Sequence, residues 1–498
     1  MGACRPAHDP DYRCHSCDPH LDDRPCVALI PLYPFQVDGA AWLAPRQDAL
    51  LADGVGLGKT RIAYAALPPH PAVIVVAPAS VKGSWKHEGE RVRPDLKFTV
   101  LTKRGSFRFP RLNEVIILNY ELLPKPRDIP RDWHPPHPTG SSVERGDYPP
   151  MPGQSAFGTR VQPGSRPPSS LVLIADEVHY AKSRKAQRTK SLEALGRVVH
   201  ELGGRRWGLT ATPLLNDPTE LRSVLMVLGL AAACGVQHFT SLKLMFSARV
   251  DRWGGHVWNR PSAQFLRWLD ACMLRRTAKE VMPELPVASN QIHPVEIRAP
   301  VRRGLDRVLD ELRAAGITLA DIMGASERAD RVVSRRGGLV FERFSAARAA
   351  LALAKIPAML EQVQLLQDAG EPVVVFSAHK APIEALCALD GFKSIVGGIA
   401  PAKRTETVAA FQGGEYAGLG CTIQAGGVGI TLTRACHAIM VDLCFTPALN
   451  LQAAGRLVRI GQTRPVVIHH LEVDHPLDKR VNEILEQKGA LIDATLLG

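Results

Sequence analysis

The chain has 498 residues, of which 45% are hydrophobic and 22% charged; this composition excludes a largely disordered protein and suits about three globular domains. Its formal net charge of +12 favours an anionic partner such as a nucleic acid. The apolar run 224–234 is far shorter than the ~20 residues of a membrane-spanning helix, and the start of the chain lacks the apolar core of a signal peptide. We therefore expect a cytoplasmic protein without a membrane partner.

Residues 1–28 form a cysteine-rich leader. The pair Cys14 and Cys17 has the C-x-x-C spacing of a zinc knuckle, and Cys4 and Cys26 flank it at irregular distances. In a cytosolic protein such a pair more often binds zinc or does redox chemistry than forms a structural disulfide. Two interpretations stay open: a small Zn²⁺ site made by these four cysteines, or a disordered leader with free thiols.

The segment 50–67, LLADGVGLGKTRIAYAAL, has the features of a phosphate-binding loop. Apolar residues precede a glycine-rich turn, and an amphipathic run follows it. Such a turn at the start of a helix presents backbone N–H groups and the helix dipole to an anion. The general pattern G-x-x-x-x-G-K-[ST] requires glycine at position 53, where this chain has Asp53, so the segment alone does not decide the matter.

Apolar, β-branched runs that end in polar residues are typical of parallel strands buried on both faces. The chain has them in two blocks, with chemistry expected at their carboxyl ends. The first block contains AVIVVAP (72–78), EVIILNY (114–120), LVLIADE (171–177) and RWGLTAT (206–212). The second contains PVVVFSAH (372–379), GCTIQAG (420–426), AIMVDLC (438–444) and VVIHHLE (466–472). We therefore predict an α/β protein with two doubly wound parallel-sheet lobes.

Residues 124–168 interrupt the first block. Twelve prolines in 45 residues exclude a helix or a central strand, so we predict a disordered surface insertion. The predicted domains are a first lobe at 29–221, a helical protrusion and linker at 222–370, a second lobe at 371–474 and a C-terminal brace helix at 475–498.

Two further motifs identify a resemblance. GLTATPLLNDPTEL (208–221) follows the acid pair Asp176-Glu177, and LQAAGRLVRIGQTRPV (451–466) closes the second block. With the GKT loop, they make the chain resemble the Swi/Snf-type DNA-dependent ATPases of helicase superfamily two, over about residues 29–490. The sequences at 212–221 and 354–380 are similar to those of the HepA-related annealing-helicase branch. In this family the phosphate-binding loop has the pattern D-E-x-G-L-G-K-T, so the aspartate at position 53 is the residue that the family pattern has there.

The resemblance implies two RecA-like lobes and a site for ATP and Mg²⁺. By this resemblance, Lys59 would contact the β and γ phosphates, and Thr60 and Asp176 would hold the Mg²⁺. Glu177 would polarise the attacking water, and Arg456 and Arg459 would act as arginine fingers. The predicted nucleotide-binding residues are Gln36, which would read the adenine, Asp53, Gly54, Gly56, Leu57, Gly58, Lys59, Thr60 and Gly429.

The chain departs from the family pattern at several positions. The family usually has an acid and an apolar residue at Gly54-Val55, a basic residue at Gln424, histidine at Val458 and Trp-Asn at Phe445-Thr446. These departures concern DNA affinity and coupling more than ATP binding.

Four functions are consistent with these residues. The favoured one is a monomeric ATP-driven motor that moves on duplex or branched DNA and remodels or reanneals it, in a compact prokaryotic or phage protein. A strand-separating helicase is the alternative within the same class, and a DNA-binding scaffold with a decayed ATPase is the alternative from another class. An RNA-stimulated ATPase is a further alternative.

The zinc hypothesis predicts a metal content. Protein purified without chelator or added metal should carry about one equivalent of Zn²⁺, because four thiolates complete a tetrahedral site. Replacement of Cys14 and Cys17 by serine should remove it. A metal analysis that finds no zinc in the unsubstituted protein would leave the leader as a chain with free thiols.

Overall fold

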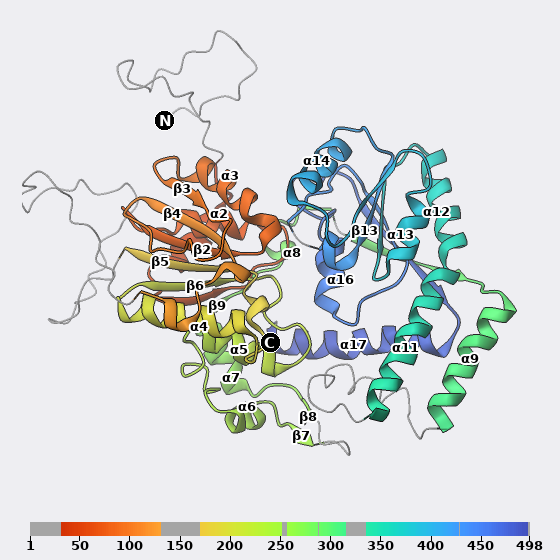
Figure 1. Ribbon diagram of the computed structural model, residues 1–498, viewed down its shortest axis with the longest axis horizontal. Helices are drawn as coiled ribbons and strands as arrows, with labels where there is room; N and C mark the ends of the chain where they lie inside the picture. Colours follow the sequence, from red (N-terminus) through yellow and green to blue (C-terminus); the bar gives the residue numbers. More distant parts are fainter. Residues whose placement is uncertain are drawn as a thin grey trace, which may run out of the picture.

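The computed structural model describes residues 31–130, 170–250, 256–286, 288–314, 335–427 and 429–496. These residues form two α/β lobes that lie side by side, with a long C-terminal helix running from one to the other (Figure 1). The predicted zinc site of the leader lies outside the described residues.

The first lobe contains a seven-stranded sheet with the order β3-β4-β2-β5-β6-β1-β9, in which every pairing is parallel. Its strands are β1 (Asp48–Leu51), β2 (Ala72–Ala77), β3 (Lys97–Val100), β4 (Glu114–Asn119), β5 (Leu171–Asp176), β6 (Arg205–Leu209) and β9 (Met273–Leu274). All residues of β2 are buried, because alternate side chains pack into different cores: Val73 and Val75 contact the side with α1 to α3, and Ile74 and Val76 the side with α4 and α5.

The second lobe contains a six-stranded sheet with the order β10-β15-β14-β11-β13-β12, also parallel throughout. Its strands are β10 (Ala288–Val295), β11 (Val373–Ser377), β12 (Phe392–Ile395), β13 (Gly418–Thr422), β14 (His437–Met440) and β15 (Val466–Val473). Val373 and Val375 face one core, and Val374 and Phe376 the other. The predicted fold class, two doubly wound parallel sheets in RecA-like lobes, is confirmed.

Helices cover both faces of each sheet (Figure 1). Those of the first lobe are α1 (Pro34–Leu43), α2 (Lys59–Ala65), α3 (Lys82–Val92), α4 (Gln187–Glu201), α5 (Pro218–Val227), α6 (Phe239–Met245), α7 (Ala263–Cys272) and α8 (Ala278–Val281). The short strands β7 (Arg249–Val250) and β8 (His256–Val257) pair antiparallel. Those associated with the second lobe are α9 (Ala299–Ala314), α11 (Arg335–Ala354), α12 (Ile356–Asp368), α13 (Lys380–Leu386), α14 (Pro401–Gln412), α15 (Ile423–Gly426), α16 (Pro447–Ala454) and α17 (Pro476–Leu496).

The middle region, 222–370, is shared between the two sheets. Strand β9 pairs with β1 at the edge of the first sheet, and α7 packs into the same core through Phe265 and Leu269. Strand β10 pairs with β15 at the edge of the second. A strand as short as β9 has too few residues to show a sequence period. The sequence analysis therefore predicted a helical protrusion and linker for this region from its helical periodicity.

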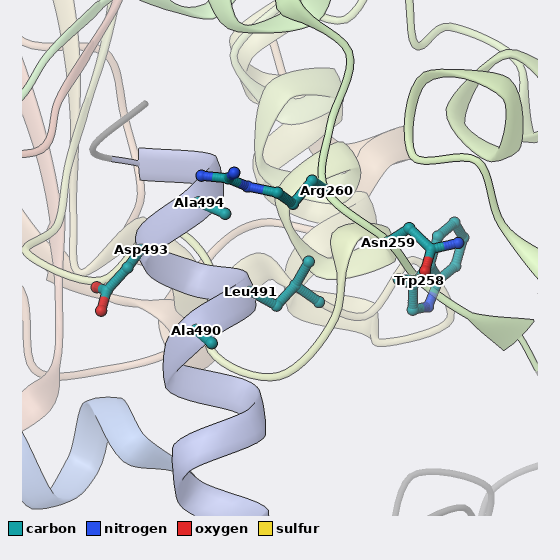
Figure 2. Close-up of a pocket in the computed structure, with 7 residues that line it drawn as sticks. All are labelled: Trp258, Asn259, Arg260, Ala490, Leu491, Asp493 and Ala494. Atoms are coloured by element: carbon teal, nitrogen blue, oxygen red, sulfur yellow. The ribbon is translucent and has the colours of Figure 1, made fainter.

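Helix α17 belongs to the cores of both lobes. Leu477 and Val481, near its start, pack in the second lobe, whereas Leu496, at its end, is buried in the first. A cavity of about 560 Å³ lies between the last turns of this helix and the segment 258–260 (Figure 2). The helix therefore contributes buried residues to both lobes and connects them.

The stretch Glu342–Asp368 is long and apolar enough to cross a membrane by length and composition. It comprises the end of α11 and all of α12, and Phe344, Met359 and Val363 are buried in the core of the second lobe. Between the two helices, the buried Lys355 pairs with Asp478 of α17 at 2.8 Å. This packing is that of core helices.

The proline-rich insertion lies outside the described residues except for its first part. Residues 126–128 form a 3₁₀ turn, and Ile129 is buried in the core of the first lobe. The first residues of the predicted insertion are therefore part of the lobe.

We predict that residues 131–168 can be replaced by a short Gly/Ser linker with little loss of thermal stability, because each doubling of loop length changes the closure free energy by only about 0.6 kcal/mol. Replacement of 124–168 should destabilise the protein further, because it also removes Ile129 from the core. Thermal unfolding of both variants measures the difference. A large stability loss in the shorter replacement would contradict the assignment.

Candidate functional site

The glycine-rich loop lies between β1 and α2, at the carboxyl edge of the first sheet. At its end, the Lys59 ammonium donates hydrogen bonds to the main-chain oxygens of Asp53 (2.8 Å) and Gly54 (3.0 Å). Burial lowers the pKa of Lys59, although the acids Glu177, Asp53 and Asp176 oppose this shift. The loop therefore holds a buried cation by its own carbonyl groups.

The carboxylate of Asp53 is fully buried and binds an arginine that follows the neighbouring strand β9. Both of its oxygens accept hydrogen bonds from Arg276, at 3.1 and 2.5 Å, and Arg276 also donates to the main-chain oxygen of Phe35 at 2.7 Å. Gln36 is buried beside them and donates to the Leu57 carbonyl at 3.1 Å. Arg276 thus ties the start of the loop to helix α1.

The acid pair lies at the carboxyl end of β5, as the sequence predicts. Asp176 accepts a hydrogen bond from the Trp85 indole at 2.7 Å, and its main-chain oxygen accepts one from the Tyr120 hydroxyl at 2.7 Å. Burial, and then the neighbouring Glu177 charge, raise the pKa of Asp176. A buried acid pair of this kind needs additional positive charge.

Glu177 has a left-handed backbone conformation, with φ of 48°. Burial opposes its ionisation, but the hydrogen bond and charge of His179, 3.3 Å away, hold its pKa below the usual value. His179 in turn contacts Thr210 at 2.9 Å, and the Thr210 hydroxyl lies 3.3 Å from the Glu177 carboxylate. Glu177 is therefore ionised at neutral pH and oriented by two neighbours.

A chain of hydrogen bonds continues from Thr210 into the second lobe. Thr212 donates its N–H to the Thr210 hydroxyl at 3.1 Å, and the Thr212 hydroxyl accepts a bond from the Gln452 amide at 3.0 Å. Gln452 lies on α16 and is buried. The Thr210 side chain, which contacts Glu177, is therefore linked to the second lobe by hydrogen bonds.

The two predicted finger arginines follow α16. Arg456 donates to the main-chain oxygens of Gly427 and Ile430, and Arg459 donates to Ile430 O at 2.9 Å and to the Thr431 hydroxyl at 3.2 Å. Burial lowers the pKa of both guanidinium groups. The Nε of Arg456 is buried without a hydrogen-bond partner among the described residues. It is a donor that suits an anion.

Both lobes line one cavity of about 790 Å³. Predicted residues that line it are Gln36, Gly56, Gly58, Lys59, Thr60, Asp176, Glu177, Gly429, Arg456 and Arg459. The other predicted loop residues, Asp53, Gly54 and Leu57, do not line it, because Asp53 turns towards Arg276 and Leu57 packs against Phe35 and Met282. These residues therefore contact the rest of the first lobe and not the cavity.

Two glycines permit the close approach of the lobes. Gly56 has φ of 82°, and a Cβ there would lie 2.9 Å from Cγ of Arg459. Gly429 has φ of 67°, and its Cβ would lie 2.1 Å from Val81. Any larger side chain at either position would separate the lobes.

The departures from the family pattern have distinct environments. Phe445 stacks on Phe344 with centroids 5.7 Å apart, and the Arg348 guanidinium lies 4.1 Å from its ring centroid. Thr446 lies 3.3 Å from Asn216 of the first lobe, whereas Gln424 is exposed. The Phe-Thr pair therefore takes part in contacts within the second lobe and between the lobes.

Comparison with protein families agrees with this geometry. Residues 35–304 match the SNF2-related domain, and residues 354–461 match the helicase conserved C-terminal domain. The chain belongs to the SNF2-related family. This confirms the predicted Swi/Snf-type membership from two matches in the expected order.

Curated relatives include the mouse DNA annealing helicase and endonuclease ZRANB3, 27% identical over 100% of this chain and 44% of that protein. The SWI/SNF-related matrix-associated actin-dependent regulator of chromatin subfamily A-like protein 1 of Xenopus tropicalis is 26% identical, over 92% of this chain and 44% of its own length. YwqA of Bacillus subtilis, whose name as an ATP-dependent helicase/translocase is provisional, is 24% identical over 93% of this chain and 48% of its own length. The chain spans less than half the length of these relatives. They support the predicted annealing-helicase branch.

Among solved structures, the SWI2/SNF2 ATPase core of Sulfolobus solfataricus in complex with double-stranded DNA matches 93% of this chain and 92% of its own, at 19% identity and a TM-score of 0.39. Because that score is low, the fold rests on the strand order described above.

Sequence reasoning assigned no role to Arg276, Trp85 or Gln452. Gln452 stands inside the motif at 451–466, and Trp85 follows the apolar run 72–78; these positions were the available signals. Arg276 follows β9, outside every recognised motif, and only the tertiary structure brings it to Asp53.

We predict that Arg276→Met destabilises the protein by about 3–5 kcal/mol, because it leaves the buried Asp53 carboxylate unpaired. Asp53→Asn alone should also destabilise, and the double variant should lose much less than the sum of the two. Chemical denaturation of the four proteins in this cycle gives the coupling energy. Additive losses would show that the pair does not stabilise the loop.

Proposed function

We propose that the protein is a DNA-dependent ATPase that uses ATP hydrolysis to move on duplex or branched DNA and to remodel or reanneal it. The carrying observation is that Lys59, Asp176 and Glu177 of one lobe line the same cavity as Arg456 and Arg459 of the other. Phosphoryl transfer needs positioning and neutralisation of charge more than covalent help, and this cavity supplies both signs of charge.

The donor groups of the cavity suit a nucleotide triphosphate with its metal. Lys59, Arg456 and Arg459 line the cavity and are cations that suit phosphate oxygens, and the raised pKa of Asp176 indicates a carboxylate that a cation would stabilise. Thr60 and Asp176 would hold Mg²⁺, which when bound neutralises phosphate charge.

The residues of the chain would then divide the work. Lys59 binds the β and γ phosphates, and the ionised Glu177 accepts a hydrogen bond from water and orients it. Arg456 and Arg459 neutralise the charge that develops on the γ phosphate. Because these arginines belong to the second lobe, hydrolysis would require the closed arrangement of the lobes, and DNA that favours closure would stimulate it.

The relatives support DNA as the partner. Two of them carry names of a DNA annealing helicase or of a SWI/SNF-related protein, and the formal charge of +12 favours a polyanion. We favour reannealing over strand separation because one of these relatives is named an annealing helicase. We propose a cytoplasmic protein that works as a monomer.

The experiment is a comparison of ATP hydrolysis without nucleic acid and with double-stranded, single-stranded and forked DNA and RNA, at low salt, where phosphate contacts are strongest. We expect duplex or forked DNA to stimulate most. Glu177→Gln is the control for contaminating ATPases, because it should keep ATP binding while hydrolysis falls by orders of magnitude. No stimulation of the wild type by any DNA would sink the motor function.

Arg459→Ala should reduce DNA-stimulated turnover by about 10³-fold, the lower end of the range for arginine fingers, because Arg456 stays nearby. ATP affinity should change little in comparison. Arg459→Lys is the matched variant: it keeps the charge without the planar fork, so it should recover only part of the rate. Rates and ATP affinities with and without duplex DNA separate the effects, and equal DNA stimulation in wild type and Arg459→Ala would exclude the finger role.

A further inference from the structure

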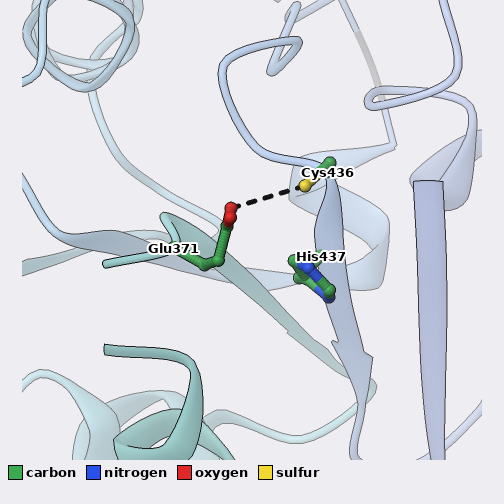
Figure 3. A group of neighbouring side chains, drawn as sticks. All are labelled: Glu371, Cys436 and His437. Atoms are coloured by element: carbon green, nitrogen blue, oxygen red, sulfur yellow. Dashed lines mark hydrogen bonds between the residues drawn. The ribbon is translucent and has the colours of Figure 1, made fainter. Parts of the chain in front are cut away.

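We propose that Glu371, Cys436 and His437 form a binding site for a divalent metal ion of the Zn²⁺ type, on the second lobe. One ligand atom of each residue lies within 4.8 Å of the others, and the side chains converge at one end of the sheet (Figure 3). This separation is small enough for a single ion to bind all three after modest side-chain rotation. The site is separate from the cavity between the lobes.

The sheet topology brings these residues together. Glu371 lies two residues before β11, and Cys436 and His437 lie at the start of β14, which pairs in parallel with β11. Parallel strands place their amino ends at one edge, so the cluster lies opposite the carboxyl edge that carries the nucleotide cavity. A metal bound here would join the end of the α12–β11 connection to the loop before β14.

The ligand set has the chemistry of zinc. A thiolate, an imidazole and a carboxylate are the three side-chain types that bind Zn²⁺, and three protein ligands leave a fourth tetrahedral position for water. The sulfur of Cys436 is buried, whereas the side chain of Glu371 is 23% exposed, so solvent reaches one side of the cluster. Harder ions such as Mg²⁺ prefer oxygen ligands alone.

Two of the three ligands, Glu371 and His437, also have a partner outside the cluster. Glu371 uses Oε1 to accept a hydrogen bond from Arg464 at 2.5 Å and keeps Oε2 towards Cys436 Sγ at 3.5 Å. One carboxylate oxygen is therefore oriented by an arginine, and the other faces the remaining ligands. Outer partners of this kind fix the geometry of metal-binding side chains.

His437 is oriented by a row of imidazoles across three neighbouring strands. Its Nδ1 lies 3.0 Å from Nε2 of His469 on β15, and Nδ1 of His469 lies 2.9 Å from Nε2 of His293 on β10. A neutral imidazole binds a metal ion through one ring nitrogen while the other nitrogen makes a hydrogen bond. With Nδ1 engaged by His469, Nε2 is the nitrogen that would face the ion.

Metal binding exchanges one proton. Without the ion, the S–H of Cys436 donates a hydrogen bond to Glu371 Oε2 at 3.5 Å. When the metal–sulfur bond forms, the S–H bond breaks and the proton passes to solvent, while the metal keeps its oxidation state. The bound ion would stabilise the second lobe, and above the dissociation constant this stabilisation would rise with the logarithm of the free metal concentration.

The test uses the full chain with Cys4, Cys14, Cys17 and Cys26 replaced by serine, so that the leader contributes no thiolate. Co²⁺ is titrated into this protein and followed by the thiolate-to-cobalt charge-transfer absorption, and Zn²⁺ is then added as a competitor. The ligand variants are Cys436→Ser and Glu371→Gln. Cys387→Ser is the matched control, because Cys387 is a half-buried cysteine of the same lobe outside the cluster.

We expect one equivalent of Co²⁺ with a thiolate band that Zn²⁺ abolishes. Cys436→Ser should lose the band, Glu371→Gln should bind at least about tenfold more weakly, and Cys387→Ser should behave as the parent protein. Absence of the band in the parent protein, or its survival in Cys436→Ser, would reduce the cluster to a hydrogen-bonded polar group. Unchanged affinity in Glu371→Gln would overturn the ligand set.

Discussion

Buried charge at the junction of the lobes is the constraint on which the rest of the structure depends. Lys59, Arg456 and Arg459 bring three cations to one cavity, and Asp176 and Glu177 bring two acids. Isolated charges in such a place would cost several kcal/mol each, so they persist only where opposite charges and hydrogen bonds are held close. Main-chain oxygens of the loops accept hydrogen bonds from Lys59 and Arg459, whereas the Nε of Arg456 has no partner among the described residues.

The same constraint determines how the lobes are joined. Gln452 reaches Thr212 across the junction, and Gly56 and Gly429 have no side chains that would separate the loops. At a greater distance, α17 contributes to the cores of both lobes. A small change in the angle between the lobes would therefore move the arginines relative to the acid pair without unfolding either core, which is the geometry that a DNA-regulated ATPase requires.

The two edges of the second sheet have different chemistry. Its carboxyl edge leads into the loop of Gly429 and the arginines, whereas its amino edge carries Glu371, Cys436 and the histidine row. Carboxyl ends of parallel strands are the usual place for catalysis, so ligands at the amino edge are expected to serve stability or regulation. A metal site at this edge could change the rigidity of the lobe while leaving the nucleotide cavity intact.

The sequence by itself determined the strand-rich blocks, the GKT loop and the acid pair, because buried parallel strands and phosphate loops depend on local patterns of apolar residues and glycines. It also identified Arg456 and Arg459 through a motif. Only the tertiary structure placed Arg276 against Asp53 and His469 against His437, because these residues are far apart in the chain and no local pattern specifies which of them meet. The division of residues 222–370 between two sheets was likewise decided by strand pairing, since β9 has two residues and no periodicity from which to predict it.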